Sequence, residues 1–377
     1  MKKKIAIIGS GISGLTLASF LKQSDDLEFI VYEKEDSLNL DEGFGIQLSV
    51  NSVSILNKIG FSQLSKNEKH HPPNLDFYSE NSKKICDLDL TIFNSKIEKY
   101  TTLKRSILIR FLKEKLLTNS LIFRKRINAI EYKNERVNIS FTDGSKDEVD
   151  YLVISDGIFS NSKPIIENKI FKPIYYGSSA IRIQTKNKNI FNFNNNNISL
   201  VMGPNSHLVV YPINQSNELN IVYIIRKKLE NNKDVKKIFN NTIFKENKNL
   251  ANCFEEASKF WPLYISSKPT KSIYQNVFYI GDAFYAFPPT LAQGASQAIE
   301  SAFEIFNLIK DNHHNIQSIY FKNREERTNL IIKRSKFNYF SFHISNKILK
   351  IFRNKILKIL VKNKKFINSY LGKVYKK

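Results

Sequence analysis

The first segment of the chain constrains its fold more than any other. Residues 5–8, Ile-Ala-Ile-Ile, form a continuous apolar run, and Gly-Ser-Gly-Ile-Ser-Gly follows at residues 9–14. A continuous apolar run is typical of a parallel strand that is buried on both faces. Apolar residues then recur through Leu21, and a second apolar run, residues 29–32, ends at Glu33. This order predicts a βαβ unit that begins almost at the first residue.

The glycines of this turn have separate physical roles in a dinucleotide site. Gly9 permits the tight turn, Gly11 lets the backbone approach a pyrophosphate, and Gly14 allows the helix to pack closely on the strand. The phosphates then lie at the helix N-terminus, around Ile12 and Ser13. Unpaired backbone amides and the helix dipole stabilise negative charge at that position. We therefore predict a Rossmann-type dinucleotide site.

An acidic residue stands at the end of the second strand. Glu33 lies roughly 20 residues beyond the glycines, where a carboxylate accepts hydrogen bonds from the ribose hydroxyls. We assign its neighbour Lys34 to the same site. Strand, helix, second strand and acid together predict an adenine dinucleotide, although this pattern alone does not separate FAD from NAD.

Charge and cysteine content limit the partners of the chain. The formal net charge of +23 at pH 7 favours nucleic acid or anionic membrane as a partner. The lysines are scattered, however, and no nucleic-acid-binding signature accompanies them, so we expect no nucleic acid. Cys86 and Cys253 have no paired spacing, which indicates neither a disulfide framework nor a thiolate site, and we expect no metal. This usage fits a cytoplasmic protein.

Further motifs occur later in the chain, and those at residues 155–157 and 281–283 directly follow predicted strands. In chain order they are Gly43-Phe44-Gly45-Ile46-Gln47-Leu48, Lys104-Arg105, Ser155-Asp156-Gly157, Gly203-Pro204 through Tyr211-Pro212, Gly281-Asp282-Ala283, Pro288-Pro289 and Gln293-Gly294-Ala295. Together with the opening fingerprint they resemble the class A FAD-dependent aromatic hydroxylases. That family is typified by para-hydroxybenzoate hydroxylase and includes salicylate and 3-hydroxybenzoate hydroxylase-like members. The resemblance covers nearly the whole chain.

The resemblance implies an α/β fold with two intimate domains and C-terminal helices. A Rossmann-type FAD-binding domain would comprise residues 1–70, 97–168 and 272–338. An inserted mixed β-sheet domain for the substrate would comprise residues 71–96 and 169–271. Residues 339–377 would form a basic amphipathic helix region, and the protein would be a monomer or a homodimer.

The resemblance also implies the reaction. FAD would stay bound, and NADPH or NADH would reduce it from a surface groove and leave. Reduced FAD would react with O2, and the resulting flavin hydroperoxide would hydroxylate a phenol or an aromatic acid. The cofactor carries the difficult chemistry, while the protein supplies position, dryness and charge. Hydroxylation or epoxidation of a lipophilic quinone precursor or polyene remains open, as does a flavin-dependent reductase without oxygenase activity.

The resemblance assigns cofactor roles to single residues. Glu33 would bind the adenosine ribose, Arg105 would lie near the phosphates, and Asp282 would bind the ribityl chain. Asp156 would help to hold FAD and would shape the nicotinamide groove. The remaining cofactor-binding positions are Gly45, Gly281, Gln293, Gly294 and Ala295.

The flavin ring would meet a helix N-terminus and a proline. Gln293 and Gly294 would place backbone amides at the pyrimidine edge of the flavin, where they would stabilise an anionic reduced ring. Pro289 would face the oxygen-reacting carbon. The chain departs from the family at Tyr285, where a histidine is usual, and this change puts the tuning of reactivity in doubt.

Candidate substrate contacts lie on two predicted strands. His207 and Tyr211 are four residues apart on one strand and therefore point to the same face. Either could orient a phenol or assist its deprotonation, and a purely structural hydrogen-bonding role is the alternative. Arg182 could pair with a substrate carboxylate. His343 lies in a predicted helix and has no partner that suggests chemistry.

The C-terminal segment is basic and amphipathic. Apolar residues recur at helical spacing from Ile348 to Leu360, with lysines and Arg353 between them. The preferred interpretation is that the apolar side packs on the FAD-binding domain and the lysines are solvated. The alternative is that the helix lies on an anionic membrane surface, peripheral to the inner membrane, which would suit a lipophilic substrate.

Overall fold

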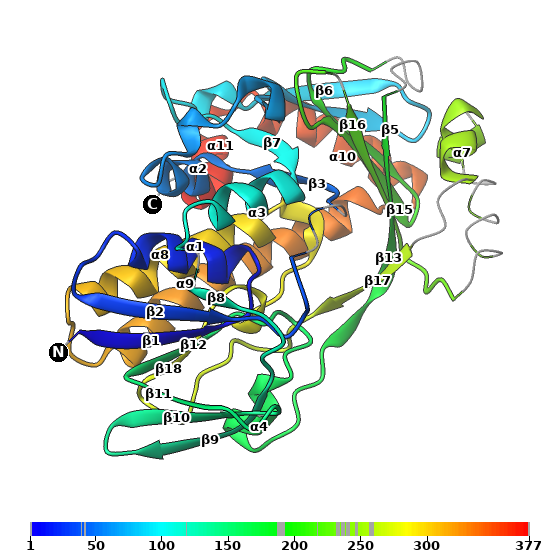
Figure 1. Ribbon diagram of the computed structural model, residues 1–377. Helices are drawn as coiled ribbons and strands as arrows, with labels where there is room; N and C mark the ends of the chain where they lie inside the picture. Colours follow the sequence, from blue (N-terminus) through cyan, green and yellow to red (C-terminus); the bar gives the residue numbers. More distant parts are fainter. Residues whose placement is uncertain are drawn as a thin grey trace.

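The computed structural model describes residues 2–375 except 39, 41–42, 118, 187–192, 217, 231–233, 235–237, 239–241, 246–247 and 256–259. The described residues form two lobes that lie side by side (Figure 1). We call them the parallel-sheet lobe and the mixed-sheet lobe. They agree with the predicted fold class, while the exact domain boundaries given above stay a prediction.

A parallel sheet forms the centre of the first lobe, in the strand order β18-β12-β1-β2-β8. The strands are β1 (Lys3–Ile8), β2 (Leu27–Tyr32), β8 (Leu121–Ile122), β12 (Tyr151–Ile154) and β18 (Val277–Tyr279). Ile5 and Ile7 are wholly buried, because α1 and α8 cover one face of the sheet and the β9–β11 sheet covers the other. Burial on both faces explains the continuous apolar run, and the predicted βαβ unit is confirmed.

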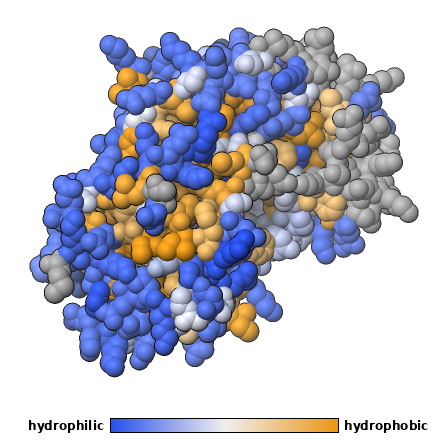
Figure 2. All heavy atoms as spheres, in the orientation of Figure 1, coloured by the Kyte–Doolittle hydropathy of each residue, from blue (hydrophilic) through white to orange (hydrophobic). Residues whose placement is uncertain are grey.

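Helices and two small sheets complete this lobe. The helices are α1 (Ile12–Leu21), α2 (Val50–Asn57), α3 (Arg105–Lys113), α4 (Ser162–Glu167), α8 (Gly294–Lys310) and α9 (Ile316–Phe342). The small sheets contain β9 (Ile127–Lys133), β10 (Arg136–Phe141) and β11 (Lys146–Val149), and β3 (Gly45–Leu48), β7 (Thr101–Lys104) and β4 (Lys69–His70). Hydrophilic residues cover the lower part of the visible face, around β9–β11, and apolar residues gather across its middle (Figure 2). This agrees with an antiparallel sheet that is solvated on one side.

The mixed-sheet lobe is built on seven strands in the order β17-β13-β16-β15-β14-β5-β6. They are β5 (Asn74–Ser79), β6 (Lys84–Asp89), β13 (Ile174–Thr185), β14 (Ile198–Gly203), β15 (Ser206–Pro212), β16 (Leu219–Ile225) and β17 (Phe260–Ile265). Leu208 and Val210 pack on one face with residues of α6 (Thr242–Lys245) and α7 (Lys248–Glu255). The alternate residues of β15 are therefore turned to the other face, which looks toward the first lobe.

The C-terminal region ends in α10 (Lys347–Leu360), α11 (Lys364–Ile367), a π-helical turn (Asn368–Gly372) and α12 (Lys373–Tyr375). The preferred prediction for this region is wrong in its orientation. On α10 the only buried residue is Arg353, which donates to the Ser341 carbonyl oxygen at 3.0 Å. Lys350 pairs with Glu80 at 2.6 Å, and Leu357 packs against the core of the mixed-sheet lobe, so α10 rests on this lobe through one ion pair and few apolar contacts. Its apolar residues Ile348, Leu349, Ile351, Phe352, Ile356 and Ile359 are each at least 50% exposed.

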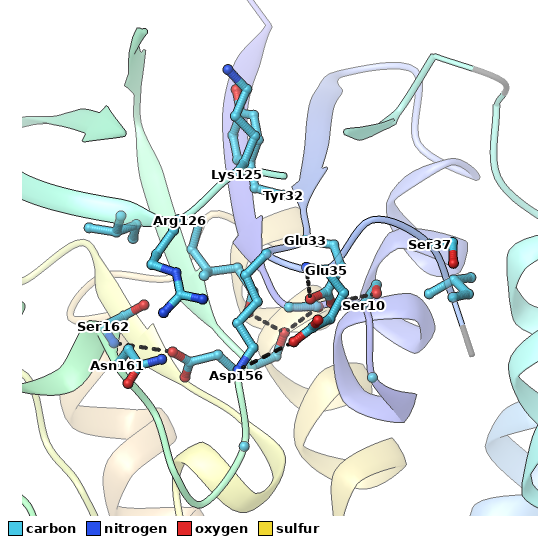
Figure 3. A pocket seen from close by; sticks show the side chains of 18 of the residues that line it. Ser10, Tyr32, Glu33, Glu35, Ser37, Lys125, Arg126, Asp156, Asn161 and Ser162 are labelled. Atoms are coloured by element: carbon cyan, nitrogen blue, oxygen red, sulfur yellow. Dashed lines mark hydrogen bonds and ion pairs between the residues drawn. The ribbon is translucent and has the colours of Figure 1, made fainter. Parts of the chain in front are cut away.

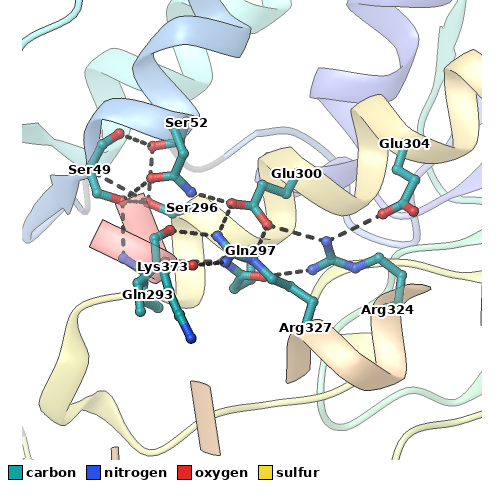
Figure 4. Close-up of polar contacts among 12 residues, drawn as sticks. Ser49, Ser52, Gln293, Ser296, Gln297, Glu300, Glu304, Arg324, Arg327 and Lys373 are labelled. Atoms are coloured by element: carbon teal, nitrogen blue, oxygen red, sulfur yellow. Dashed lines mark hydrogen bonds and ion pairs between the residues drawn. The ribbon is translucent and has the colours of Figure 1, made fainter. Parts of the chain in front are cut away.

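A buried polar network ties α2, α8, α9 and the C-terminus together (Figure 4). Glu300 of α8 is wholly buried, and Arg327 of α9 binds it through two hydrogen bonds of 2.7 and 2.9 Å. Arg324, 2% exposed, donates to Glu300 at 3.3 Å and to Gln297 at 2.7 Å. Arg327 also donates to the carbonyl oxygens of Lys373 and Val374. Arg324 also pairs with Glu304 at 3.5 Å, so Glu300 is the carboxylate shared by two arginines that connect α8, α9 and the C-terminus.

We predict that Glu300→Gln lowers the free energy of unfolding by about 3 kcal/mol at pH 7, because Arg327 loses its carboxylate partner and the buried Arg324 keeps only Glu304, at 3.5 Å. Burial raises the pKa of Glu300, but the hydrogen bonds and charges of Arg327 and Arg324 hold it below the ordinary value of 4.5. Its stabilising effect is therefore complete above pH 4.5 and is lost as the pH falls further. Urea unfolding at pH 7 and at low pH measures both effects.

The matched control is Asp36→Asn, which breaks an ion pair with Arg124 whose side chains are 76% and 77% exposed. It should cost less than about 1 kcal/mol. If the two variants were equally stable at pH 7, the stabilising role of the network would be disproved.

Candidate cofactor and substrate site

The glycine turn has the close packing that its sequence predicts. Gly9 has φ +101°, and a Cβ on it would lie 2.8 Å from the Ser155 carbonyl oxygen. A Cβ on Gly14 would lie 2.1 Å from the Gly9 carbonyl oxygen, so neither position accepts a side chain. Around a Cβ on Gly11, in contrast, no atom of the described residues beyond its chain neighbours lies within 4 Å. This open space beside the N-terminus of α1 fits the predicted approach of a pyrophosphate.

A cavity of about 330 Å³ begins at this turn and follows the carboxyl ends of β1, β2 and β12 (Figure 3). The predicted residues that line it are Gly9, Gly11, Glu33, Lys34, Arg105 and Asp156. Glu33 accepts hydrogen bonds from the Ser10 amide at 2.8 Å and from the Ser10 hydroxyl at 2.6 Å. The turn therefore orients the carboxylate that is expected to meet a ribose.

Asp156 presents an unpaired polar atom at this cavity. Its Oδ2 accepts a hydrogen bond from the Ser162 amide at 3.2 Å, whereas its Oδ1 is buried and has no partner among the described residues. Burial raises the pKa of Asp156. A buried carboxylate oxygen without a donor is costly, and a ligand hydroxyl could supply the missing donor.

Cations approach the cavity from two segments. Arg105 begins α3 and lines the cavity. Burial lowers the pKa of its guanidinium, and the charge of Asp282 offsets only part of this effect. Arg126, which we did not predict, also lines the cavity and extends into it in Figure 3. The run Arg124-Lys125-Arg126 follows β8 after one residue, Phe123, and the carboxyl end of β8 lies beside that of β2. This run of cations was the available sequence signal.

A second cavity, of about 270 Å³, lies between the two lobes. We call it the central cavity. On the side of the parallel-sheet lobe it is lined by Asp282, Pro289, Ala292, Gln293, Gly294 and Ala295. Gly294 begins the 17-residue helix α8, and no atom of the described residues outside its own helix and chain neighbours lies within 4 Å of a Cβ placed on it. Free helix amides and open space together form a cradle that a planar, electron-accepting ring can enter.

Asp282 connects the two cavities electrostatically. Its carboxyl is exposed to the central cavity on one side, and protein atoms enclose it on the other sides. This burial raises its pKa to about 6, against the opposing charges of Lys163 and Arg105. Gly281 beside it has φ +57°, and a Cβ there would lie 2.6 Å from Ser13 Oγ. The Gly-Asp motif thus packs on the first turn of α1.

Gly45 and Gln293, two further predicted cofactor positions, line the central cavity. The Gly45 amide donates to Asn220 Oδ1 at 2.7 Å. The Gln293 side chain is buried and donates to Ser49 Oγ at 3.0 Å, which joins the α8 N-terminus to the network of Figure 4. Tyr285 is buried and packs on Phe287, with ring centroids 5.0 Å apart.

The inner face of the mixed sheet forms the opposite wall of the central cavity. Arg182, His207 and Tyr211 all line it, in agreement with the predicted common face. The Tyr211 hydroxyl donates to the Gly45 carbonyl oxygen at 2.7 Å, and burial raises its pKa. Arg182 is half-buried, and no hydrogen bond or ion pair of its guanidinium occurs within the described chain. Strand β13 thus places in the cavity a cation without a partner among the residues that the structure describes.

His343 has a partner, contrary to our prediction. At the C-terminus of α9 its Nε2 lies 2.6 Å from Nδ1 of His207. Burial lowers the pKa of His207 to about 3, and burial with the neighbouring His207 and Arg226 lowers that of His343 to about 2. Both imidazoles are therefore neutral at pH 7. The two residues are 136 positions apart, and no local pattern connects them.

Comparison with known proteins places this geometry in a family. A family model described as "FAD binding domain" matches residues 2–311. The chain is 25% identical to 3-amino-4-hydroxybenzoate 2-monooxygenase PtnB3 of Streptomyces platensis, over 82% of this chain and 80% of that protein. It is 22% identical to salicylate hydroxylase of Pseudomonas putida, over 82% and 77% of the two chains.

A solved structure has the same fold. The crystal structure of Klebsiella pneumoniae HpxO, complexed with FAD and uric acid, superposes with a TM-score of 0.84 at 17% identity, over 99% of this chain and 96% of that one. The family match covers most of the chain, including the glycine turn, both lobes and the Gly-Asp motif. The protein therefore belongs to the FAD binding domain family.

Proposed function

We propose that this protein is an FAD-dependent monooxygenase that uses NAD(P)H and O2 to hydroxylate an aromatic substrate with a phenol or acid group. One observation carries the proposal. In the central cavity the α8 N-terminus and Pro289 face an uncompensated Arg182 and the Tyr211 hydroxyl across a space of about 270 Å³. The names of the relatives that act on 3-amino-4-hydroxybenzoate or salicylate support an aromatic acid as substrate.

The residues of the first cavity fit the dinucleotide part of FAD. The open space at Gly11 and the amides of Ile12, Ser13 and Gly14 would receive the diphosphate, with Arg105 beside them. Glu33 would accept from a ribose, and the unpaired Asp156 Oδ1 offers a further acceptor. FAD, when bound, supplies the electron transfer from NAD(P)H to O2. The α8 amides would stabilise negative charge on its ring.

The substrate would lie between the ring cradle and the mixed sheet. The Arg182 guanidinium can bind a carboxylate through two parallel hydrogen bonds. The neutral imidazole of His207 can accept a hydrogen bond from a phenol, and the Tyr211 oxygen can orient the ring, because its own hydrogen is engaged by Gly45. These roles for His207, Tyr211 and Pro289 are our proposal, and the alternative for both His207 and Tyr211 is structural hydrogen bonding.

We further propose that the protein binds an anionic membrane surface through α10. Six apolar side chains of this helix are at least 50% exposed. Residues 327–377 contain 15 lysines and arginines and no aspartate or glutamate. Exposed apolar side chains among cations are what an interfacial helix presents to anionic lipid. None of the helices among the described residues is long and apolar enough to cross a membrane.

We predict that Arg182→Met lowers kcat/KM for an aromatic acid on the order of 100-fold, because the substrate carboxylate loses a partly buried cationic partner. The FAD content should not change, since Arg182 lies on the opposite wall of the cavity. Substrate-stimulated NAD(P)H oxidation with product analysis measures the effect. Arg136→Met, on the solvated β10 strand, is the control and should match the wild type. Equal kcat/KM in Arg182→Met and wild type would refute the role of this residue.

We predict that FAD affinity falls in acid through Asp282. Burial raises the pKa of its carboxyl to about 6 in the protein without ligand, so protonation below that pH removes the acceptor expected for the ribityl hydroxyls. Binding should be roughly tenfold weaker at pH 5 than at pH 7, as measured by quenching of FAD fluorescence. Asp282→Asn should bind weakly and without this pH dependence, whereas Asp87→Asn on β6 should retain it. An unchanged slope in Asp282→Asn would assign the titration to another group.

We predict that the wild-type protein floats with phosphatidylglycerol vesicles and much less with phosphatidylcholine. Replacing both Phe352 and Ile356 by Asn should reduce the floated fraction at least tenfold, because each apolar side chain contributes about 1.5–3 kcal/mol on burial. The control replaces Ile170 and Ile273, 80% and 61% exposed in the other lobe, by Asn. Flotation that is equal in both double variants would eliminate α10 as the contact.

A further inference from the structure

A third cavity, of about 180 Å³, lies between the mixed sheet and the C-terminal helices. Its sheet wall is apolar and includes Phe77, Leu200 and Met202. Its helix wall includes Leu357 and Leu360 of α10. We call it the apolar cavity. An apolar cavity left empty destabilises a folded protein, and one with such a lining binds apolar ligands rather than water.

The apolar cavity adjoins the central cavity. Both are lined by Gln47, His207, Val209, Pro289 and Ala292. The reason lies in the sheet order, in which β15 separates β13 and β16 from β14 and β5. The inner faces of these strands form one continuous wall, which carries Arg182 of β13 at one end, His207 and Tyr211 of β15 in the middle, and only apolar side chains of β14 and β5 at the other end.

We infer that the substrate is amphipathic, with an aromatic acid or phenol in the central cavity and a hydrocarbon chain in the apolar cavity. This inference rests on the proposed function and names its substrate class. A carboxylate bound by Arg182 would place the rest of the substrate in the central cavity, which Pro289 also lines. Pro289 lines the apolar cavity as well, so a chain on the ring could enter that cavity from there. The order of polar anchor, reacting ring and chain follows the order of residues along the wall.

The helix that closes the apolar cavity is the one with the exposed apolar surface. On α10, Leu357 and Leu360 line the cavity, while their neighbours Ile356 and Ile359 are 52% and 66% exposed on the outside. A hydrocarbon chain dissolved in a membrane would meet the outer side of α10 and enter along its inner side. The shared helix gives a chain-bearing substrate a short route from lipid to the reacting position.

The experiment uses the full-length enzyme loaded with FAD and a series of salicylates that carry no chain or a linear alkyl chain of increasing length. We measure kcat/KM from NAD(P)H oxidation together with the hydroxylated product. The inference predicts that kcat/KM rises up to about fourfold per methylene until the cavity is full and then levels off. A value that does not rise with chain length overturns the inference.

Paired variants test the place of the chain. Leu357→Trp and Leu360→Trp fill the apolar cavity and should flatten the dependence on chain length, while kcat/KM for salicylate without a chain stays within twofold of wild type. Ile356→Trp and Ile359→Trp are the outward-facing controls and should retain the wild-type dependence. Equal losses for all substrates in the inward-facing variants would mean that the cavity has only a structural role.

The two levels of the proposal fail differently. If salicylate is hydroxylated but longer chains bring no gain, the chain site is refuted and the monooxygenase stands. If FAD binds but no member of the series yields a hydroxylated product, the proposed function itself is refuted. The use of two cavity-filling positions keeps the test valid when one of them prevents folding.

Discussion

The close approach of α1 to the turn after β1 is the constraint on which the rest of the site depends. A Cβ on Gly14 would come within 2.1 Å of the Gly9 carbonyl oxygen, so any side chain there would displace the helix. Displacement would move the amides at the start of α1 away from the groove beside Glu33. It would also move α8, because Phe20 of α1 packs on Phe303 and Phe306 with ring centroids 4.8 and 5.4 Å apart. The absence of a side chain at Gly14 therefore allows the N-termini of both α1 and α8 to take their places at the cavities.

The charges of the site are arranged along the same path. Arg105 and Lys163 oppose the burial of Asp282, and the cost of burial still leaves its pKa near 6. Burial lowers the pKa of Lys163 to about 8, so the cost of burial exceeds the charge pairing for both Lys163 and Asp282. Such incomplete pairing is common where a polar ligand completes the network. Glu300 is the contrasting case, because Arg324 and Arg327 both donate hydrogen bonds to it inside the protein.

Local patterns predicted the features that depend on neighbours in the chain. The βαβ unit, the paired face of His207 and Tyr211 and the strand-end position of Asp282 follow from spacing and from the rule that parallel strands gather their carboxyl ends. The His207–His343 contact could not be predicted, since it depends on how α9 ends against β15. Arg126 was marked only by a run of cations, which is more often a solvated surface. Pairings across lobes need the tertiary structure.

The orientation of α10 shows why amphipathic spacing alone misled us. The spacing correctly identifies two sides of the helix, and the ordinary expectation turns the apolar side inward. Here the Arg353 guanidinium binds the Ser341 carbonyl oxygen and Lys350 binds Glu80, so polar contacts fix the inner side. Leu357 and Leu360 add apolar contacts at the cavity. Because polar contacts hold the inner side of α10, its exposed apolar residues do not stabilise the fold. Their exposure to water is unfavourable, which favours a partner outside the chain.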